Sequence, residues 1–85
     1  MSVAETRKQV ERVGQSMSGL KKNLDGAAKQ FSGAGKQAQS ILKGSATSVE
    51  QQVTEAIKQA EQAATKAADA VNKAVDVCNK WVSEH

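Results

Sequence analysis

The sequence has few of the residues from which small globular cores and catalytic sites are built. It has no proline and no tyrosine, and its only aromatic residues are Phe31 and Trp81. Hydrophobic residues make up 39% of the chain, and alanine is the commonest of them. A buried methylene contributes only about 0.8 kcal/mol, and a core in a chain this short rarely supplies more than about 3–5 kcal/mol. These values favour a thin helical protein that borrows burial from a partner over a compact enzyme.

The scarcity of cysteine and histidine excludes several kinds of chemistry. Cys78 is the single cysteine, so no disulfide framework and no four-cysteine or mixed zinc site can form within the chain. His85 is the single histidine and the last residue, where chains fray, so it is a poor general base. We therefore expect no catalytic residue, no metal site and no cofactor: the protein is predicted not to be an enzyme.

Long apolar runs are also missing. No stretch approaches the ~20 apolar residues of a membrane span, and the N-terminal residues show no signal peptide. The sequence predicts no stable membrane insertion and a cytoplasmic location, or export without a cleaved signal peptide.

Charge is divided unevenly between the two halves of the chain. The 12 basic and 9 acidic residues give a net charge of +3. Residues 1–44 hold eight basic and three acidic side chains, whereas residues 45–85 hold four basic and six acidic ones. Opposite signs favour packing of one half on the other or on a second copy. Because the basic residues are dispersed and lack interleaved aromatics, no nucleic-acid binding is expected.

Hydrophobic residues repeat with the spacing of helices that bury one face. In the first half, two rows have members seven residues apart: Val3, Val10, Met17, Leu24, Phe31 and Ala38, and Thr6, Val13, Leu20, Ala27, Ala34 and Ile41. In the second half, the steps alternate between four and three through Val53, Ile57, Ala60, Ala64, Ala67, Val71, Ala74, Cys78 and Trp81. This 4–3 alternation predicts two helices that pack side by side.

A single short interruption separates the two patterns. Gly44 suits the C-cap of a first helix, and Thr47-x-x-Glu50 or Ser48-x-x-Gln51 suits the N-cap of a second. A joint this short folds the helices back on each other. We predict one domain over residues 1–85: an all-α antiparallel two-helix hairpin, with helices over about 2–43 and 48–84 and a turn at 44–47.

The expected pairing places large side chains against small ones. Centring the turn near 45–46 sets Val13 opposite Cys78 and Ala34 opposite Ile57, so Cys78 is predicted to be a core residue. The same alignment sets Trp81 opposite Val10 at the open end. Trp81 is then either an anchor that closes the hairpin or an exposed contact for a partner.

Two features indicate a partner beyond the hairpin. Three glycines seven residues apart lie inside the first helix. They are either an irregularity that the helix tolerates, a groove in which another helix packs, or the site of a break in the helix at residues 32–35. The second helix carries apolar residues off its main row, a wider arc than one neighbour covers. The candidate interface residues are Gly19, Gly26, Gly33, Val75, Val77, Trp81 and Val82. A second copy or another helical protein completing a four-helix bundle would cover them.

The segment Leu42-Lys43-Gly44-Ser45-Ala46 resembles the W-x-G-x-A turn of the WXG family, small helical hairpins that are substrates and partners of type VII secretion systems. Leu42 replaces the defining Trp, which is similar to the related LXG proteins, toxins whose long N-terminal helices bind small hairpin partners. The family's C-terminal export pattern, an aromatic followed four residues later by an acid, is not met, because His85 follows Trp81. The resemblance implies a turn motif of Leu42, Gly44 and Ala46.

The expected function is therefore non-catalytic helix–helix recognition. The protein is predicted to be a WXG-like secretion substrate, or a partner or targeting factor of an LXG-type toxin, with a helical partner or a second copy bound. An amphipathic protein on a membrane surface and an intracellular coiled-coil assembly module are the alternatives.

Overall fold

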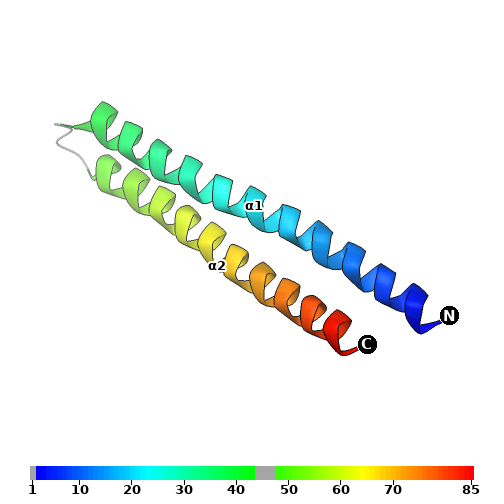
Figure 1. The fold of residues 1–85 in the computed structure, drawn as a ribbon. Helices are drawn as coiled ribbons and strands as arrows, with labels where there is room; N and C mark the ends of the chain where they lie inside the picture. The colour runs from blue at the N-terminus through cyan, green and yellow to red at the C-terminus, as the bar shows by residue number, and fades with distance from the viewer. Residues whose placement is uncertain (1, 44–47) are drawn as a thin grey trace.

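The fold is an all-α antiparallel hairpin, as the sequence predicts. The computed structural model describes residues 2–43 and 48–85, so the expected C-cap Gly44 and the capping residue Thr47 lie outside the described residues. Helix α1 spans Val3–Leu42 and helix α2 spans Val49–Glu84. The two lie side by side along their whole length, with both termini at one end of the rod (Figure 1).

Local signals at the described helix ends explain where the helices begin. Ser2 caps α1, and its hydroxyl accepts a hydrogen bond from the main-chain N–H of Glu5 at 3.2 Å. Ser48 precedes α2, but its hydroxyl accepts from the side chain of Gln52 at 3.3 Å and caps no main-chain N–H. Lys43 leaves helical geometry with φ −58° and ψ 129°, which ends α1.

The first helix runs without interruption through its glycines. It contains 40 residues and continues across Ser32-Gly33-Ala34-Gly35, so the break considered for that segment does not occur. The molecule measures 66 × 17 × 13 Å. An uninterrupted α1 keeps each row of residues seven apart in sequence on one side of the rod.

The core of the hairpin is thin. Ala64 and Ala68 are the buried hydrophobic residues among those described, at 8% and 2% exposure, and Gly14 is buried with them. The protein exposes 6306 Å² of surface. A compact monomer of 9.0 kDa exposes about 4,900 Å², so the hairpin shows about 1,400 Å² more.

The expected pairing is wrong by one residue of α1. A methyl group added at Gly14 would lie 3.5 Å from Cβ of Cys78, and one added at Gly35 would lie 3.4 Å from Cγ2 of Ile57. Glycine, rather than Val13 or Ala34, therefore faces α2 at these two levels. At both positions the added methyl group would be in ordinary van der Waals contact with a side chain of α2.

This shift removes one predicted row from the interface between the helices. Val13 is 51% exposed, Leu20 is 53% exposed and Ile41 is 80% exposed, and Ala34 is exposed as well. Their places against α2 are taken by the next row, which is half-buried except for the buried Gly14: Gly14, Lys21, Ala28, Gly35 and Leu42. The small residues in this row allow α2 to pack against it. The larger side chains of the neighbouring α1 row remain exposed to solvent.

A candidate partner-binding face

One side of the hairpin is polar on both helices. A groove between them is lined from α1 by Ser32, Lys36 and Gln39 and from α2 by Thr54, Lys58 and Glu61. Phe31, Gly35 and Ile57 also line it. The residues of α1 and α2 that line this groove must therefore lie on the same side of the rod. The Thr54 hydroxyl is enclosed here and has no hydrogen-bond partner.

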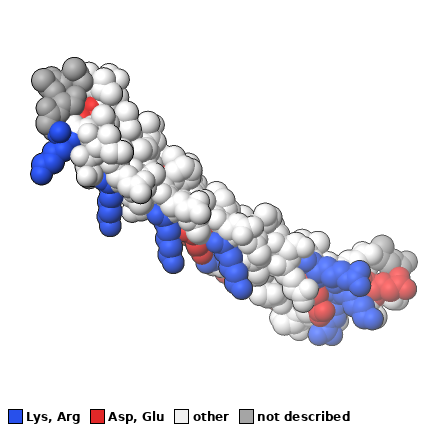
Figure 2. All heavy atoms as spheres, turned by 90° about the horizontal axis from the view of Figure 1, so that it is seen from above, with Lys and Arg blue, Asp and Glu red and all other residues white. Residues whose placement is uncertain are grey.

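A row of lysines follows this polar side along α1. Its members are seven residues apart and exposed: Lys22, Lys29, Lys36 and Lys43. Figure 2, which views the rod from the α1 side, shows basic side chains leaving along one edge, whereas the opposite edge shows no charged side chain over the middle of the rod. Within residues 2–43 and 48–85, the ion pairs closer than 4.0 Å are Arg7–Glu11 and Lys21–Asp25, so this lysine row is unpaired.

The opposite side of the hairpin carries no charged residue over most of its length. On each helix, a row seven residues apart lies across from the polar groove: Val13, Leu20, Ala27, Ala34 and Ile41 on α1, and Val49, Ala56, Ala63, Ala70 and Val77 on α2. We call these two rows, with the half-buried rows between them, the apolar face. Most of its rim is exposed, with Val77 at 67% and Val49 at 45%.

The half-buried rows inside the apolar face are also uncharged. Val10, Met17, Leu24 and Ala38 of α1 and Val53, Ala60, Ala67 and Ala74 of α2 are each partly covered by the other helix. Phe31 belongs to the same α1 row and is 38% exposed. A contiguous apolar surface of this kind on a small protein is typical of an interaction site.

Trp81 closes the apolar face at the open end of the rod. It is half-buried, and its indole stacks on the ring of His85 with 4.2 Å between centroids and 11° between planes. His85 Nδ1 lies 2.9 Å from the main-chain carbonyl of Trp81. One side of the Trp81 ring is thus occupied within α2.

The remaining predicted interface residues do not gather on one surface. Val75 and Val82 are half-buried in the α2 row that includes Thr54 and Glu61, on the polar side of the interface between the helices. Gly19 and Gly33 are exposed, and an added methyl group at Gly19, Gly26 or Gly33 would meet nothing within 4 Å. These glycines therefore lie on the side of α1 that is turned away from α2.

The predicted turn motif is only partly described. Leu42 is half-buried at the end of α1. Gly44 and Ala46 lie outside the described residues. Leu42 belongs to the α1 row that faces α2, which gives it a packing role at this end of the hairpin.

Lys21 is the one charged residue in the α1 row that packs on α2. Its ammonium donates a hydrogen bond to Asp25 at 2.9 Å, and this bond, together with the charges of Asp25 and then Asp69, raises the pKa of Lys21 above 10.5. Since Asp69 belongs to α2, Lys21 is attracted to a charge on each helix.

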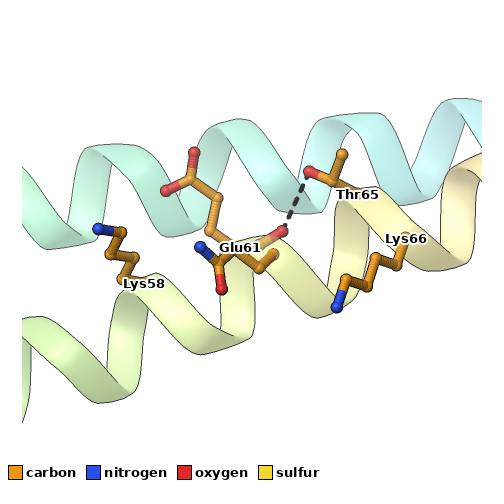
Figure 3. A pocket seen from close by; sticks show the side chains of 5 residues that line it. Lys58, Glu61, Thr65 and Lys66 are labelled. Carbon is orange, nitrogen blue, oxygen red and sulfur yellow. Dashed lines mark hydrogen bonds between the residues drawn. The ribbon is translucent and has the colours of Figure 1, made fainter.

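The polar surface of α2 carries a second groove, lined by lysine, glutamate, glutamine and threonine. Figure 3 shows a shallow groove on α2 where Lys58 and Lys66 point apart and the Thr65 hydroxyl donates to the main-chain carbonyl of Glu61 at 3.1 Å. In residues 2–43 and 48–85, no three side chains among His, Cys, Asp and Glu gather as metal ligands. Across the same residues, neither helix is long and apolar enough to cross a membrane.

No protein family, no curated protein and no solved structure matches the chain. The apolar face is the feature on which a functional argument can be built.

The sequence revealed part of this face. The α2 side of the face is indicated by apolar residues off the main row, whereas the sequence pattern favours the α1 side as part of the hairpin core. The signal that would have separated the two is the row Gly14, Lys21, Ala28, Gly35 and Leu42. Two glycines about six turns apart, in line with a leucine and an alanine, mark a helix surface on which another helix can pack.

Proposed function

We propose that this protein is a non-catalytic helix–helix interaction protein whose apolar face docks on the helices of a partner. Docking would complete a four-helix bundle, with two helices from each side. The observation that carries this proposal is the uncharged face, whose large side chains at Leu20, Ile41 and Val77 are more than half exposed.

The energetics of the exposed rim support a partner. Full burial of one leucine, isoleucine or valine contributes about 1.5–3 kcal/mol, and these three retain half or more of that surface in water. Among residues 2–43 and 48–85, the hydrophobic side chains that the hairpin buries to below a tenth of their surface are those of Ala64 and Ala68. A partner would therefore add apolar burial that the interface between α1 and α2 does not supply.

The setting we propose is type VII secretion, in which the protein is a substrate or a partner of a secreted toxin with long N-terminal helices. The support is the resemblance of Leu42-Lys43-Gly44 to the L-x-G joint, together with two helices of 40 and 36 residues on either side of it. In this setting the apolar face would pack on the toxin helices, and the polar side would remain exposed to the secretion machinery.

The test compares two glutamate substitutions on α1 with opposite placement. Leu20→Glu puts a charge in the apolar face, and Gln15→Glu puts the same charge at an exposed position in line with the lysine row. Tagged wild type and both variants are used to capture bound proteins from the host cells after cross-linking, and the cross-linked residues are identified.

We expect wild type and Gln15→Glu to retain the same partner, or the same second copy, cross-linked through residues beside the apolar face. Leu20→Glu should lose it, because burying an unpaired carboxylate costs several kcal/mol. Equal capture by all three proteins, or cross-links confined to the lysine row, would contradict the proposed function. Circular dichroism of Leu20→Glu serves as the folding control, since Leu20 lies outside the interface between α1 and α2.

A further inference from the structure

We propose that the lysine row of α1 holds the hairpin on the surface of an anionic lipid bilayer, without insertion, so that the apolar face is turned away from the lipid. The row consists of exposed residues, Lys22, Lys29, Lys36 and Lys43. This inference goes beyond the proposed function, because it assigns a ligand to the other side of α1 and does not depend on which protein the apolar face binds.

The lysine row and the apolar face lie on nearly opposite sides of α1. Each lysine of the row follows, by two positions, one member of the α1 row of the apolar face: Leu20, Ala27, Ala34 and Ile41. Residues two apart on a helix point in directions about 160° different. A bilayer that contacts the lysines therefore lies on the far side of α1 from Leu20, and the apolar face stays accessible to a partner.

The lysine row is straight, which suits a planar ligand. Helix α1 continues without a break from Val3 to Leu42, so lysines seven residues apart follow one another about every 10.5 Å along a straight rod. From Lys22 to Lys43 the row covers about 32 Å. All of its ammonium groups can reach one plane at the same time. Figure 2 shows the basic side chains extending from the rod along this edge.

Neighbouring carboxylates do not neutralise the lysine row. Its last two members have no acidic residue within four positions in the sequence. Its first two share a single carboxylate within that range, that of Asp25, which already accepts a hydrogen bond from Lys21 at 2.9 Å. On α2, Glu61 lines the groove beside Lys36, and Lys58 offsets its charge there. The row therefore presents ammonium groups that the negative potential of an anionic bilayer attracts.

A second row of lysines, on α2, lacks this excess of positive charge. Lys66, Lys73 and Lys80 are also seven residues apart and exposed. Each of them has an aspartate three or four residues away, at Asp69 or Asp76. Over the whole of α2, six acidic residues outnumber four basic ones, whereas in α1 seven basic residues outnumber three acidic ones. An anionic bilayer is therefore attracted to α1 and not to α2.

The spacing of the lysine row favours a bilayer over a nucleic acid. A nucleic-acid strand carries one phosphate about every 3.4 Å, so ammonium groups about 10.5 Å apart neutralise few of them. Along a duplex, a straight line crosses each phosphate backbone about once in a turn of about 34 Å, which is close to the length of the whole row. Anionic lipid head groups, by contrast, move laterally within the bilayer and can gather beneath each lysine.

The test measures binding of the full chain to lipid vesicles by co-sedimentation. One set of vesicles contains equal parts of phosphatidylglycerol and phosphatidylcholine, and the other set contains phosphatidylcholine alone. The α1 triple variant removes three charges from the row: Lys22→Gln, Lys29→Gln and Lys36→Gln. The α2 triple variant, with the same net charge, is the matched control at exposed positions: Lys66→Gln, Lys73→Gln and Lys80→Gln. Circular dichroism checks that both variants keep their helices.

We expect the wild-type protein to bind the anionic vesicles and not the neutral ones, and to be released as salt is raised. The α1 triple variant should bind about 100-fold more weakly, which corresponds to about 3 kcal/mol, or about 1 kcal/mol for each lysine. The α2 triple variant should stay within a few-fold of wild type. Equal losses in the two triple variants would overturn the inference, because net charge alone would then account for binding. Absence of wild-type binding at low salt would overturn it as well.

Two further measurements test the orientation and the ligand. Leu20→Glu should bind the anionic vesicles within a few-fold of wild type, since its carboxylate lies on the side of α1 away from the bilayer. A loss as large as that of the α1 triple variant would mean that the apolar face enters the lipid, and would overturn the inference. Tighter binding to duplex DNA than to the anionic vesicles, at equal concentrations of phosphate, would also overturn it. None of these results changes the capture of a partner through the apolar face, so the proposed function is tested separately.

Discussion

The clearest separation between hairpin stability and partner binding comes from the glycines on the outer side of α1. Replacing Gly19, Gly26 and Gly33 with alanine adds three methyl groups, and each would meet nothing within 4 Å. No contact between the helices changes. The effect on stability therefore comes from the conformational freedom that glycine gives to the unfolded chain and from its low helix propensity.

The size of the effect follows from that reasoning. An exposed glycine inside a helix costs about 0.5–1 kcal/mol relative to alanine, so three independent substitutions should raise the free energy of unfolding by about 2 kcal/mol. In a chain of this size, each kcal/mol moves the melting midpoint by about 4–8 °C, so the midpoint should rise by roughly 10–15 °C.

The assay is urea unfolding followed by circular dichroism, with Gln30→Ala and Gln37→Ala as a control pair at exposed α1 positions. The control should shift stability by only a few tenths of a kcal/mol, since glutamine is already a good helix former. We expect the triple variant to unfold at higher urea with an unchanged slope. A variant that unfolds at lower urea, or that loses its partner, would refute the reasoning and show that a helix packs closely on these glycines.

Three further substitutions test other parts of the structure. Gly14→Ala should stabilise the hairpin by about 1 kcal/mol in thermal melting, because its methyl group would sit 3.5 Å from Cys78 Cβ in ordinary contact; a loss of stability would mean that the helices are closer than described. Thr54→Val should raise the free energy of unfolding by about 1 kcal/mol, because it removes an enclosed hydroxyl without a hydrogen-bond partner, and a decrease would show that the hydroxyl is satisfied. Leu42→Glu combined with Gly44→Val should reduce export or partner binding more than it reduces helicity, and unchanged export would remove the joint from the functional account.

The row that contains Val10, Met17 and Leu24 shows which part of the fold the sequence predicts. Its spacing of seven, followed by a break near Gly44 and a second alternation of four and three, is sufficient to predict two antiparallel helices. The structure has both helices and places this row half-buried against α2. Periodicity decides this much because it is a property of each helix alone.

Two rows of α1 flank Val10, Met17 and Leu24. Which of these two rows packs against α2 depends on how both helices are arranged, not on α1 alone. Rules based on side-chain size favour Val13, Leu20 and Ile41 for the core. The structure instead places Gly14 and Gly35 there, facing the side chains of Cys78 and Ile57. Sequence periodicity carries no information on the distance between helix axes, and this explains the error of one residue.

The predicted interface residues of α2 lie on two different sides of the helix, again because the position of α1 decides which residues share a face. Val77 and Trp81 lie on the apolar face of α2, but Val75 and Val82 lie on the other side of the line along which α1 packs. Residues two apart point in directions about 160° different on a helix, so which of them joins a common face depends on where the neighbouring helix lies. The position of the line along which α1 packs on α2 is given by the structure and not by the sequence pattern.

Cross-linked capture of the partner by the wild-type protein, Gln15→Glu and Leu20→Glu tests the central claim most directly. The apolar face is intact in the wild type and in Gln15→Glu, so both should retain the same partner. Leu20→Glu should lose this partner with unchanged circular dichroism, since Leu20 is 53% exposed in the hairpin. Equal capture by all three proteins would contradict the account, because the charge in the apolar face would then have no effect on binding.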